Sequence, residues 1–381
     1  MKTSNGVKKK KKKIIRKKIL KKKRRIIRQP KRKEKILEKR EKKVIIFKKH
    51  GNNPIIEPNH KNTWESKATF NPAAIEKDGK FHILYRAIGD TDMSVLGYAS
   101  SKDGFIFDER LNEPAYISKK QSKTILSSYI SPYISGGGGN GGCEDPRLSL
   151  IDDILYMIYT SFNGNLPRVA LTSIKIDDFI NKRWRKWKKS VLISKPGEVH
   201  KNWVIFPEKI KGKYAILHSI SPEISIEYVD SLDFDGKTYI KSHYGYHGKK
   251  DKKRWDSWIR GAGPTPLKTK YGWLVLYHAM DRRDPDRYKL GAMILDAKNP
   301  AKVLHRSKIP LIEPDKYYEN CGHKAGVVYS CGAIIANDLI YVYYGGADTV
   351  TCVAVAELEN FLNKLVADKK PVLKNVKNKK I

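Results

Sequence analysis

The sequence has few cysteines and no long hydrophobic run. Only four of its 381 residues are cysteines, and no two of them form a CxxC pair. This scarcity argues against a disulfide framework or a cysteine-based zinc site, and it is typical of a reducing compartment. No stretch of 18 apolar residues occurs, and no apolar segment follows the basic N-terminus. We therefore expect no membrane span and no cleaved signal, and the simplest expectation is a cytoplasmic protein.

Acidic residues are also scarce, and the shortage is uneven along the chain. The sequence holds 40 Asp and Glu against 77 Lys and Arg, a net charge of +37. Residues 1–49 contain 26 of the basic residues and 3 of the acidic ones, which predicts a low-complexity tail that is disordered or helical. Such a tail is either a solvated extension or an arm that contacts nucleic acid or an anionic surface. The sequence leaves both interpretations open.

Helical periodicity is rare, and residues 358–366 are the best helical candidate. From residue 50 the chain instead has short apolar runs rich in Ile, Val, Tyr and Leu, which predict strands. Polar turns divide these runs into five strand–turn–strand–strand copies, centred near residues 79, 153, 212, 272 and 337. This repetition predicts an all-β fold, a five-bladed β-propeller over residues 50–366, with a basic C-terminal tail at 367–381.

The segment 141–147 is the most informative for chemistry, because it places two adjacent carboxylates between a glycine run and an arginine. Adjacent residues of a regular strand point to opposite faces, so we expect only one of Glu144 and Asp145 to face the propeller axis. The other would hold the scaffold by pairing with Arg147. The alternative interpretation is a turn at the start of a blade that is capped by an Asp.

Basic and polar side chains recur at similar places in successive repeats. Taken singly, each is explained as a surface charge or as a satisfied core histidine. Together they predict an anion site, because Arg, Lys and His donors that converge suit the oxygens of phosphate. The recurring residues are Arg168, His200, Lys201, Asn202, Arg260 and His278.

Seven stretches from about Asn53 to Leu358 resemble glycoside hydrolase family 130, the β-mannoside phosphorylases and their hydrolase relatives. They are NPAAI at 71–75, LYRA at 84–87, GCEDPR at 142–147, HKNW at 200–203, RGAGP at 260–264, YKLGA at 288–292 and YYGGAD at 343–348. The resemblance covers about 300 residues, with the motifs in the expected order. It implies a five-bladed propeller, in agreement with the repeat count.

The resemblance also implies a role for most of these residues. Asp145 resembles the general acid, which acts through a sugar hydroxyl in similar enzymes. Lys201, Asn202, Arg260, His278 and Tyr288 match positions that hold phosphate, whereas Arg168 joins this set only by the repeat argument. Contacts to mannose are implied for Asn71, Arg86 and Asp348, and we expect Arg147 in the substrate-binding set as well.

A single acid beside a basic cradle is the pattern expected of inverting phosphorolysis. Phosphate is already anionic, so it needs cations that align it and no second carboxylate to activate it, unlike water in an inverting hydrolase. We expect a β-mannoside and phosphate to give α-mannose 1-phosphate, without a metal or another cofactor. The alternatives are a β-mannoside hydrolase and a non-catalytic carbohydrate-binding propeller tethered by its tail. Linkage, β-1,2 or β-1,4, the acceptor sugar and a possible homo-oligomer stay open.

Overall fold

The computed structural model describes residues 47–118, 138–242 and 254–367. By its internal contacts the chain divides between Ile46 and Phe47, and every described residue belongs to the second part. Nearly all of the predicted basic N-terminal tail and C-terminal tail therefore lies outside the described residues. Within the described part, no helix is long and apolar enough to cross a membrane. All four cysteines are free thiols.

The largest sheet consists of two antiparallel meanders joined at one edge. Its path is β2 (Ala68–Lys77), β3 (Lys80–Ile88), β4 (Met93–Ser101), β6 (Gly141–Ile151), β7 (Ile154–Phe162), β8 (Pro167–Lys175) and β9 (Val191–Leu192), with β5 (Glu109–Arg110) beside β4. Only two parallel residue pairs join β4 to β6, Met93 with Gly141 and Ser94 with Gly142. The sheet therefore contains two separate four-stranded units.

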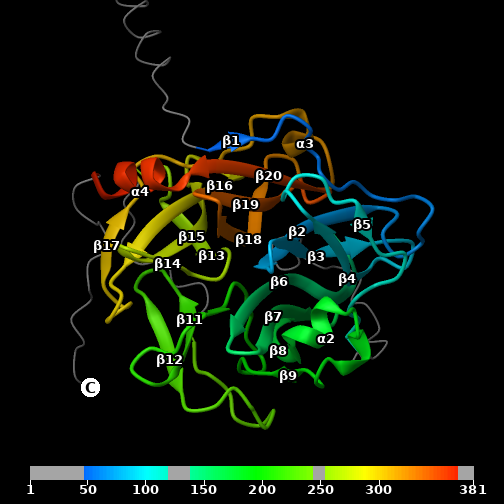
Figure 1. Ribbon diagram of the computed structural model, residues 1–381, viewed down its shortest axis with the longest axis horizontal. Coiled ribbons are helices and arrows are strands. Elements are labelled where there is room, and N and C mark those ends of the chain that lie inside the picture. Colours follow the sequence, from blue (N-terminus) through cyan, green and yellow to red (C-terminus); the bar gives the residue numbers. More distant parts are fainter. Residues whose placement is uncertain (1–46, 119–137, 243–253, 368–381) are drawn as a thin grey trace, which may run out of the picture. The chain divides into compact units, whose positions relative to one another are not determined.

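Three smaller sheets follow along the chain, and each is an antiparallel meander. They comprise β10 (Val204–Ile205), β11 (Tyr214–Ser219) and β12 (Ser225–Val229); then β13 (Trp258–Ala262), β14 (Leu267–Thr269), β15 (Gly272–Asp281), β16 (Asp284–Leu295) and β17 (Val303–Arg306); then β18 (Val328–Ala336), β19 (Leu339–Gly346), β20 (Val350–Glu357) and β1 (Lys48–Lys49). Counted with the two units of the largest sheet, the described residues contain five meanders (Figure 1).

The hairpin turns explain why the strands lie where the sequence predicted them. Asp78 and Gly79, and again Asn337 and Asp338, have positive φ angles at both central positions, the geometry that matches the twist of two-residue hairpins. The five strands that follow the predicted turn centres are confirmed as β3, β7, β11, β15 and β19. The predicted C-terminal helix is confirmed as α4 (Leu358–Ala367). Short helices α2 (Ile176–Ile180) and α3 (Tyr317–Asn320) and a 3₁₀ turn (Trp184–Lys186) lie in connections.

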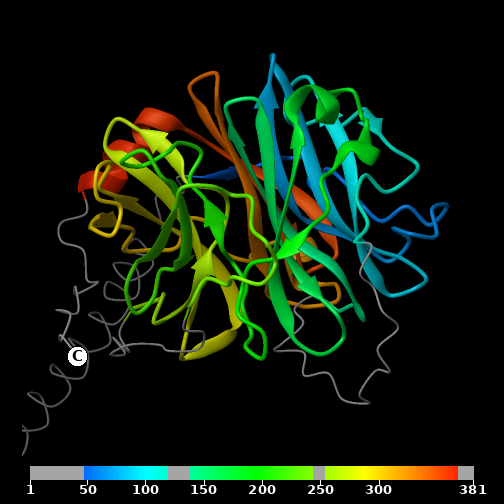
Figure 2. The ribbon, with the colours of Figure 1, turned by 90° about the horizontal axis from the view of Figure 1, so that it is seen from below.

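Each meander packs against the next one along the chain, and the last packs against the first. Strand pairs in contact include β2 with β6, β6 with β10, β11 with β13, β16 with β18 and β18 with β2. Figure 2 shows the blue strands β2 and β3 beside the green strands β6 and β7. Apolar clusters fill the spaces between meanders, for example Leu84 and Tyr98 with Met157 between the first two.

The first strand of the described chain completes the last sheet. Lys48 and Lys49 pair with Val355 and Ala354 of β20, while the buried Phe47 ring packs edge-on against Phe361 at 5.1 Å. Phe47, Lys48 and Lys49, which composition assigns to the basic tail, therefore pack on the last sheet and α4. The physical reason is that β20 needs an edge partner, a requirement that lysine content does not reveal.

Candidate active site

The first strands of four meanders are irregular at the same end. In each, the register with the neighbouring strand shifts at one point, and the extra residue that causes the shift is a β-bulge. The shifts fall between Phe70 and Ala73 in β2, Glu144 and Arg147 in β6, Ile259 and Gly261 in β13, and Ser330 and Gly332 in β18. Bulges re-aim side chains and are frequent beside active sites.

Four polar residues near these bulges have left-handed backbone conformations. The φ angles are +49° at Asn71, +50° at Asp145, +66° at Asn202 and +50° at Asp348. Such angles are uncommon outside glycine and persist only where the surrounding structure enforces them. The chain packs closely here, because a Cβ on Gly345 would lie 2.1 Å from Oδ1 of Asn71. The strained positions therefore belong to one site.

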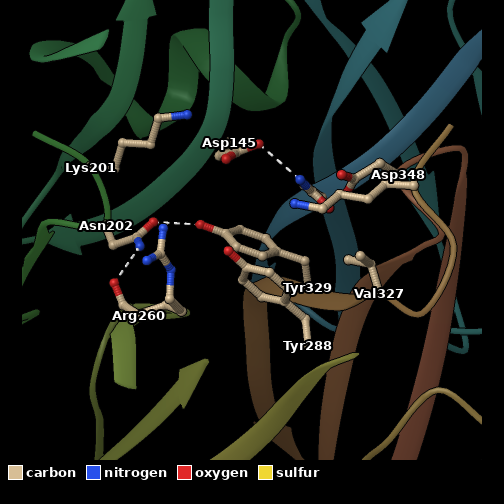
Figure 3. Close-up of a pocket in the computed structure, with 10 residues that line it drawn as sticks. Asp145, Lys201, Asn202, Arg260, Tyr288, Val327, Tyr329 and Asp348 are labelled. Atoms are coloured by element: carbon tan, nitrogen blue, oxygen red, sulfur yellow. Dashed lines mark hydrogen bonds between the residues drawn. The ribbon is translucent and has the colours of Figure 1, made fainter. Parts of the chain in front are cut away.

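A pocket opens where these residues converge (Figure 3). Its lining contains seven of the side chains that the sequence singled out, together with three that it did not. The seven are Asn71, Asp145, Lys201, Asn202, Arg260, Tyr288 and Asp348, and the three are Lys324, Val327 and Tyr329. The signal for Tyr329 was available, since it lies at the start of its repeat as Asn71 does.

Asp145 is a buried carboxylate surrounded by donors. Its Oδ1 accepts hydrogen bonds from Nδ2 of Asn71 at 2.9 Å and Nη1 of Arg86 at 3.4 Å. Burial raises the pKa of Asp145, but the positive charges of Arg86 and Lys201 outweigh it, so the pKa lies below the usual value of an Asp. This carboxyl group is therefore ionised at neutral pH.

Glu144 and Asp145 do not point to opposite faces. Arg86 donates to Oε1 of Glu144 at 3.0 Å as well as to Asp145, and Lys201 lies 3.4 Å from Oε2 of Glu144. The expected alternation is wrong because the bulge after Glu144 and the left-handed angle at Asp145 interrupt the regular strand. Both carboxylates share one guanidinium, and the scaffold partner of Glu144 is Arg86, not Arg147.

Arg147 lies behind the pocket lining and holds it together. Its guanidinium donates to the main-chain oxygens of Gly263 at 3.0 Å and Asp145 at 2.8 Å. It also donates to Oδ1 of Asn202 at 2.9 Å and to the Tyr329 hydroxyl at 3.3 Å. These bonds use the planar fork of the side chain in several directions. Arg147 thus orients Asp145 and Asn202. The sequence analysis expected a substrate contact for Arg147 and did not predict this orienting role.

His278 is fully buried beneath the pocket and carries no charge at neutral pH. Burial lowers its pKa to about 3, helped by the nearby positive charge of Arg147. The Ser330 amide donates to its Nε2 at 2.9 Å, and its ring stacks on Tyr329 with centroids 3.8 Å apart. The site therefore differs from the converging Arg, Lys and His that the sequence suggested, because this imidazole is neutral and lies outside the lining.

Arg168 is not brought to the pocket. Its guanidinium donates to the main-chain oxygen of Ser194 and lies over the Tyr239 ring, 5.1 Å from the centroid. Arg168 lies on β8, the third strand of its meander, whereas Asn71, Asp145, Arg260 and Tyr329 of the pocket lie on first strands.

Asp348 is the second carboxyl group of the pocket, and its state differs from that of Asp145. Burial raises the pKa of Asp348 to about 6, although Lys324 acts in the opposite direction. Two carboxyl groups whose environments move their pKa values apart are a common arrangement in acid–base sites. In the described part of the chain, no cluster of three or more His, Cys, Asp or Glu side chains is arranged to hold a metal ion.

Comparisons with known proteins agree with this arrangement. The model of a family described as beta-1,4-mannooligosaccharide phosphorylase matches residues 30–367. A 1,2-beta-oligomannan phosphorylase of Thermoanaerobacter sp. (strain X514) is 38% identical over 328 residues, 82% of this chain and 98% of that protein. A beta-1,2-mannobiose phosphorylase of the same organism is 35% identical, over 81% of this chain and 96% of that protein.

Solved structures show the same likeness. A glycosyl hydrolase from Bacteroides ovatus superposes with a TM-score of 0.66 at 25% sequence identity, covering 82% of this chain and 94% of that one. The family match spans most of the chain, and the identity to two phosphorylases exceeds 30% over nearly their whole lengths. The chain belongs to glycoside hydrolase family 130.

Proposed function

We propose that this protein is an inverting β-mannoside phosphorylase. The observation that carries the proposal is the pocket lining, where Asp145 stands opposite Lys201, Asn202 and Arg260 (Figure 3). An acid on one side and cations on the other match the two needs of phosphorolysis. These are a proton for the leaving sugar and positive charges that bind and align phosphate. Family membership and the two phosphorylase relatives support the same reaction.

In the proposed reaction a phosphate oxygen attacks the anomeric carbon of mannose from the face opposite the leaving oxygen. The bond from that carbon to the bridging oxygen breaks, and the proton of Asp145 reaches the bridging oxygen through a sugar hydroxyl. Inversion converts the β-mannoside into α-mannose 1-phosphate and frees the acceptor sugar. Arg86 and Asn71, which bond Asp145 directly, hold its carboxyl group in place.

Phosphate binding supplies the condition under which Asp145 can act as an acid. Its pKa is lowered because Arg86 and Lys201 lie close to it. A phosphate anion bound by Lys201 offsets part of that positive charge, and a nearby negative charge raises the pKa of a carboxyl group. We infer that Asp145 takes up its proton more readily when phosphate is bound.

We propose further that the five meanders form a five-bladed β-propeller. Three facts support this: five antiparallel units, contact of each with its successor and of the last with the first, and the pairing of β1 with β20 across the two ends of the chain. In a propeller the first strands of the blades line the axis, so the bulged first strands that carry Asn71, Asp145, Arg260 and Tyr329 would face that axis. An experimental structure that closes the ring would test this architecture.

For the linkage we propose β-1,2-mannosides. The two Thermoanaerobacter relatives, at 38% and 35% identity, are named for 1,2-linked β-mannans, whereas a β-1,4-mannooligosaccharide phosphorylase of Ruminococcus albus is 28% identical.

The test is reverse phosphorolysis. The protein is incubated with α-mannose 1-phosphate and a panel of acceptors, mannose, glucose, N-acetylglucosamine and both mannobioses, and released phosphate is measured. We expect release that depends on the acceptor, with β-1,2-linked products identified by NMR. Products with a β-1,4 linkage, or a mixture of linkages, would overturn the β-1,2 assignment. No phosphate release with any acceptor would overturn phosphorolysis.

One observation favours a second candidate, a β-mannoside hydrolase on the same fold. The pocket contains a second carboxyl group, Asp348, beside Asp145, and inverting hydrolases need two. Cleavage of β-mannobiose in phosphate-free buffer, at a rate unchanged by added phosphate, would select this alternative. Inertness both with and without phosphate would leave a carbohydrate-binding protein.

A further inference from the structure

A cation that the sequence motifs did not include reaches the pocket from the connection between β17 and β18. Lys324 lines the pocket with Tyr288 and Asp348, and its Nζ lies 4.8 Å from the centroid of the Tyr288 ring. The part of the chain that the structure describes offers this amine no hydrogen bond. A half-buried ammonium held over an aromatic face and beside an open pocket is available to a ligand.

The position of Tyr288 shows at which wall of the pocket Lys324 lies. The Tyr288 and Tyr329 rings stand between Asn202 and Arg260 on one side and Val327 and Asp348 on the other (Figure 3). The Tyr329 hydroxyl bonds Asn202, and Nδ2 of Asn202 donates to the main-chain oxygen of Arg260 at 3.0 Å. Lys324, over the Tyr288 ring and beside Asp348, therefore reaches the pocket from the wall that faces Arg260 and Asn202 across these rings.

The loop that carries Lys324 is built around one buried carboxylate, that of Glu319, which is fully inaccessible to solvent. Its Oε2 accepts from the main-chain amides of Asp315 at 2.8 Å and Lys316 at 2.9 Å, and from Nζ of Lys49 at 2.6 Å. Its Oε1 accepts from the Tyr344 hydroxyl at 2.8 Å. Four donors satisfy this buried charge, as burial of a carboxylate requires.

The main chain of Glu319 also forms hydrogen bonds, and these connect the loop to the pocket wall. Its carbonyl oxygen accepts from the amides of Gly326 at 2.9 Å and Val327 at 3.2 Å, and the Lys324 amide donates to the Ala347 oxygen at 2.9 Å. A Cβ on Gly322 would lie 2.4 Å from the Thr349 hydroxyl, so the loop lies directly on the turn that bears Asp348. These contacts hold the backbone of Lys324 in one place.

We propose that Lys324 is a third cationic ligand of the phosphate, and that Glu319 is a positioning residue that sets its place in the pocket. The inference rests on the proposed phosphorylase function and names a contact of that same site. With Lys201 and Arg260 on the far side and Lys324 across Tyr288, the anion is held from two walls of the pocket, which restricts its orientation for attack.

The experiment separates phosphate from sugar binding. In Lys324→Met the aliphatic stem can still cover Tyr288 but the charge is lost, and Lys324→Arg restores a charge. We expect Lys324→Met to raise the KM for phosphate about 10- to 100-fold, the range of one charge-assisted hydrogen bond, with the KM for β-mannoside within about 2-fold. Lys324→Arg should recover most of the loss. The matched control is Lys268→Met, which removes an exposed lysine paired with Glu208.

Glu319→Gln tests the positioning role, because it removes the negative charge and keeps the shape. We expect it to raise the KM for phosphate in the same direction, by about 3- to 10-fold, with little change in kcat. Thermal unfolding is measured in parallel; if the variant does not fold, the two Lys324 variants still decide the phosphate contact. An unchanged phosphate KM in Lys324→Met, or a rise only in the mannoside KM, would overturn the proposal.

Calorimetric titration with inorganic phosphate distinguishes this proposal from the proposed function. If wild-type protein binds phosphate but does not use it in turnover, phosphorolysis fails, and a loss of phosphate binding in Lys324→Met still supports the assignment. If the wild-type protein binds no phosphate, both are wrong.

Discussion

Two of the buried clusters of opposite charges in the described residues differ in a way that explains which one is a site. Around Asp145, the hydrogen bonds from described residues reach only Oδ1, and Lys201 and Asp348 face an open pocket nearby. Around Asp256, at the start of the fourth meander, both oxygens are occupied. Arg254 donates to Oδ1 at 2.8 Å, while Arg306 and the Tyr277 hydroxyl donate to Oδ2 at 2.8 and 2.6 Å.

The two carboxylates are almost equally inaccessible, with 5% of Asp145 and 2% of Asp256 exposed. Both have a lowered pKa, because arginine charges outweigh the effect of burial. Burial and a perturbed pKa therefore do not distinguish them. The difference is the backbone, since Asp145 lies at a bulge with a left-handed φ that turns it toward an open space. A saturated cluster stabilises the fold, and an unsaturated one is available for chemistry.

The sharpest test of this comparison is Asp145→Asn. If Asp145 is the general acid, the variant should lose about 1,000-fold or more in kcat for reverse phosphorolysis while its unfolding midpoint stays close to that of the wild type. The measurement is phosphate release from α-mannose 1-phosphate, with thermal unfolding as the control. A variant that keeps a tenth of the activity would show that another group provides the proton.

Asp256→Asn should lower the stability of the protein and leave its phosphate KM nearly unchanged. Removing the charge leaves Arg254 and Arg306 buried without their counter-ion, and a broken buried pair costs about 3 to 5 kcal/mol in the free energy of unfolding. The KM for phosphate should change little, because Asp256 does not line the pocket. Urea unfolding and kinetics at 20 °C below the new midpoint provide the measurement. If the variant raised the KM for phosphate without a loss of stability, Asp256 would belong to the site and not to the structural cluster.

Asp348→Asn should make the protein more stable at pH 7.5. The pKa of Asp348 is raised in the folded state to about 6 from 3.8, so the folded protein binds this proton more tightly than the unfolded chain. Stability from this group is complete below about pH 4 and is lost as the pH rises through 6. We expect the variant to gain about 3 kcal/mol at pH 7.5 and nothing at pH 4, in urea unfolding at both values. A less stable variant at pH 7.5 would contradict this.

The smallest effect is expected for Arg168→Met. Because Arg168 bonds the Ser194 carbonyl and covers Tyr239 outside the pocket, the KM for phosphate should stay within about 2-fold of the wild type, as for other residues remote from a ligand. Arg260→Met, whose side chain lines the pocket, is the matched comparison and should raise this KM at least about 10-fold. Equal effects of the two substitutions would restore the repeat argument for Arg168.

Several features of the site could be predicted from the sequence, and the β-bulges could also have been predicted but were missed. The motif residues led to seven of the ten pocket side chains. The bulges were also signalled, because Pro72 and Pro146 directly follow Asn71 and Asp145 within strands. A proline inside a strand has no amide to donate and is tolerated at bulges. Reading segment 141–147 as a regular strand produced the wrong alternation of Glu144 and Asp145.

The sequence by itself determined the hairpins, the turn positions, the C-terminal helix and the identity of most pocket residues. Turn chemistry and strand patterning act over a few neighbouring residues, so they are visible locally. Only the tertiary structure decided that Arg86 joins both carboxylates, that His278 is neutral, that Arg168 is elsewhere and that Lys324 enters the pocket. Those outcomes depend on packing between elements that are distant in sequence, where a shift of one residue changes which side chains meet.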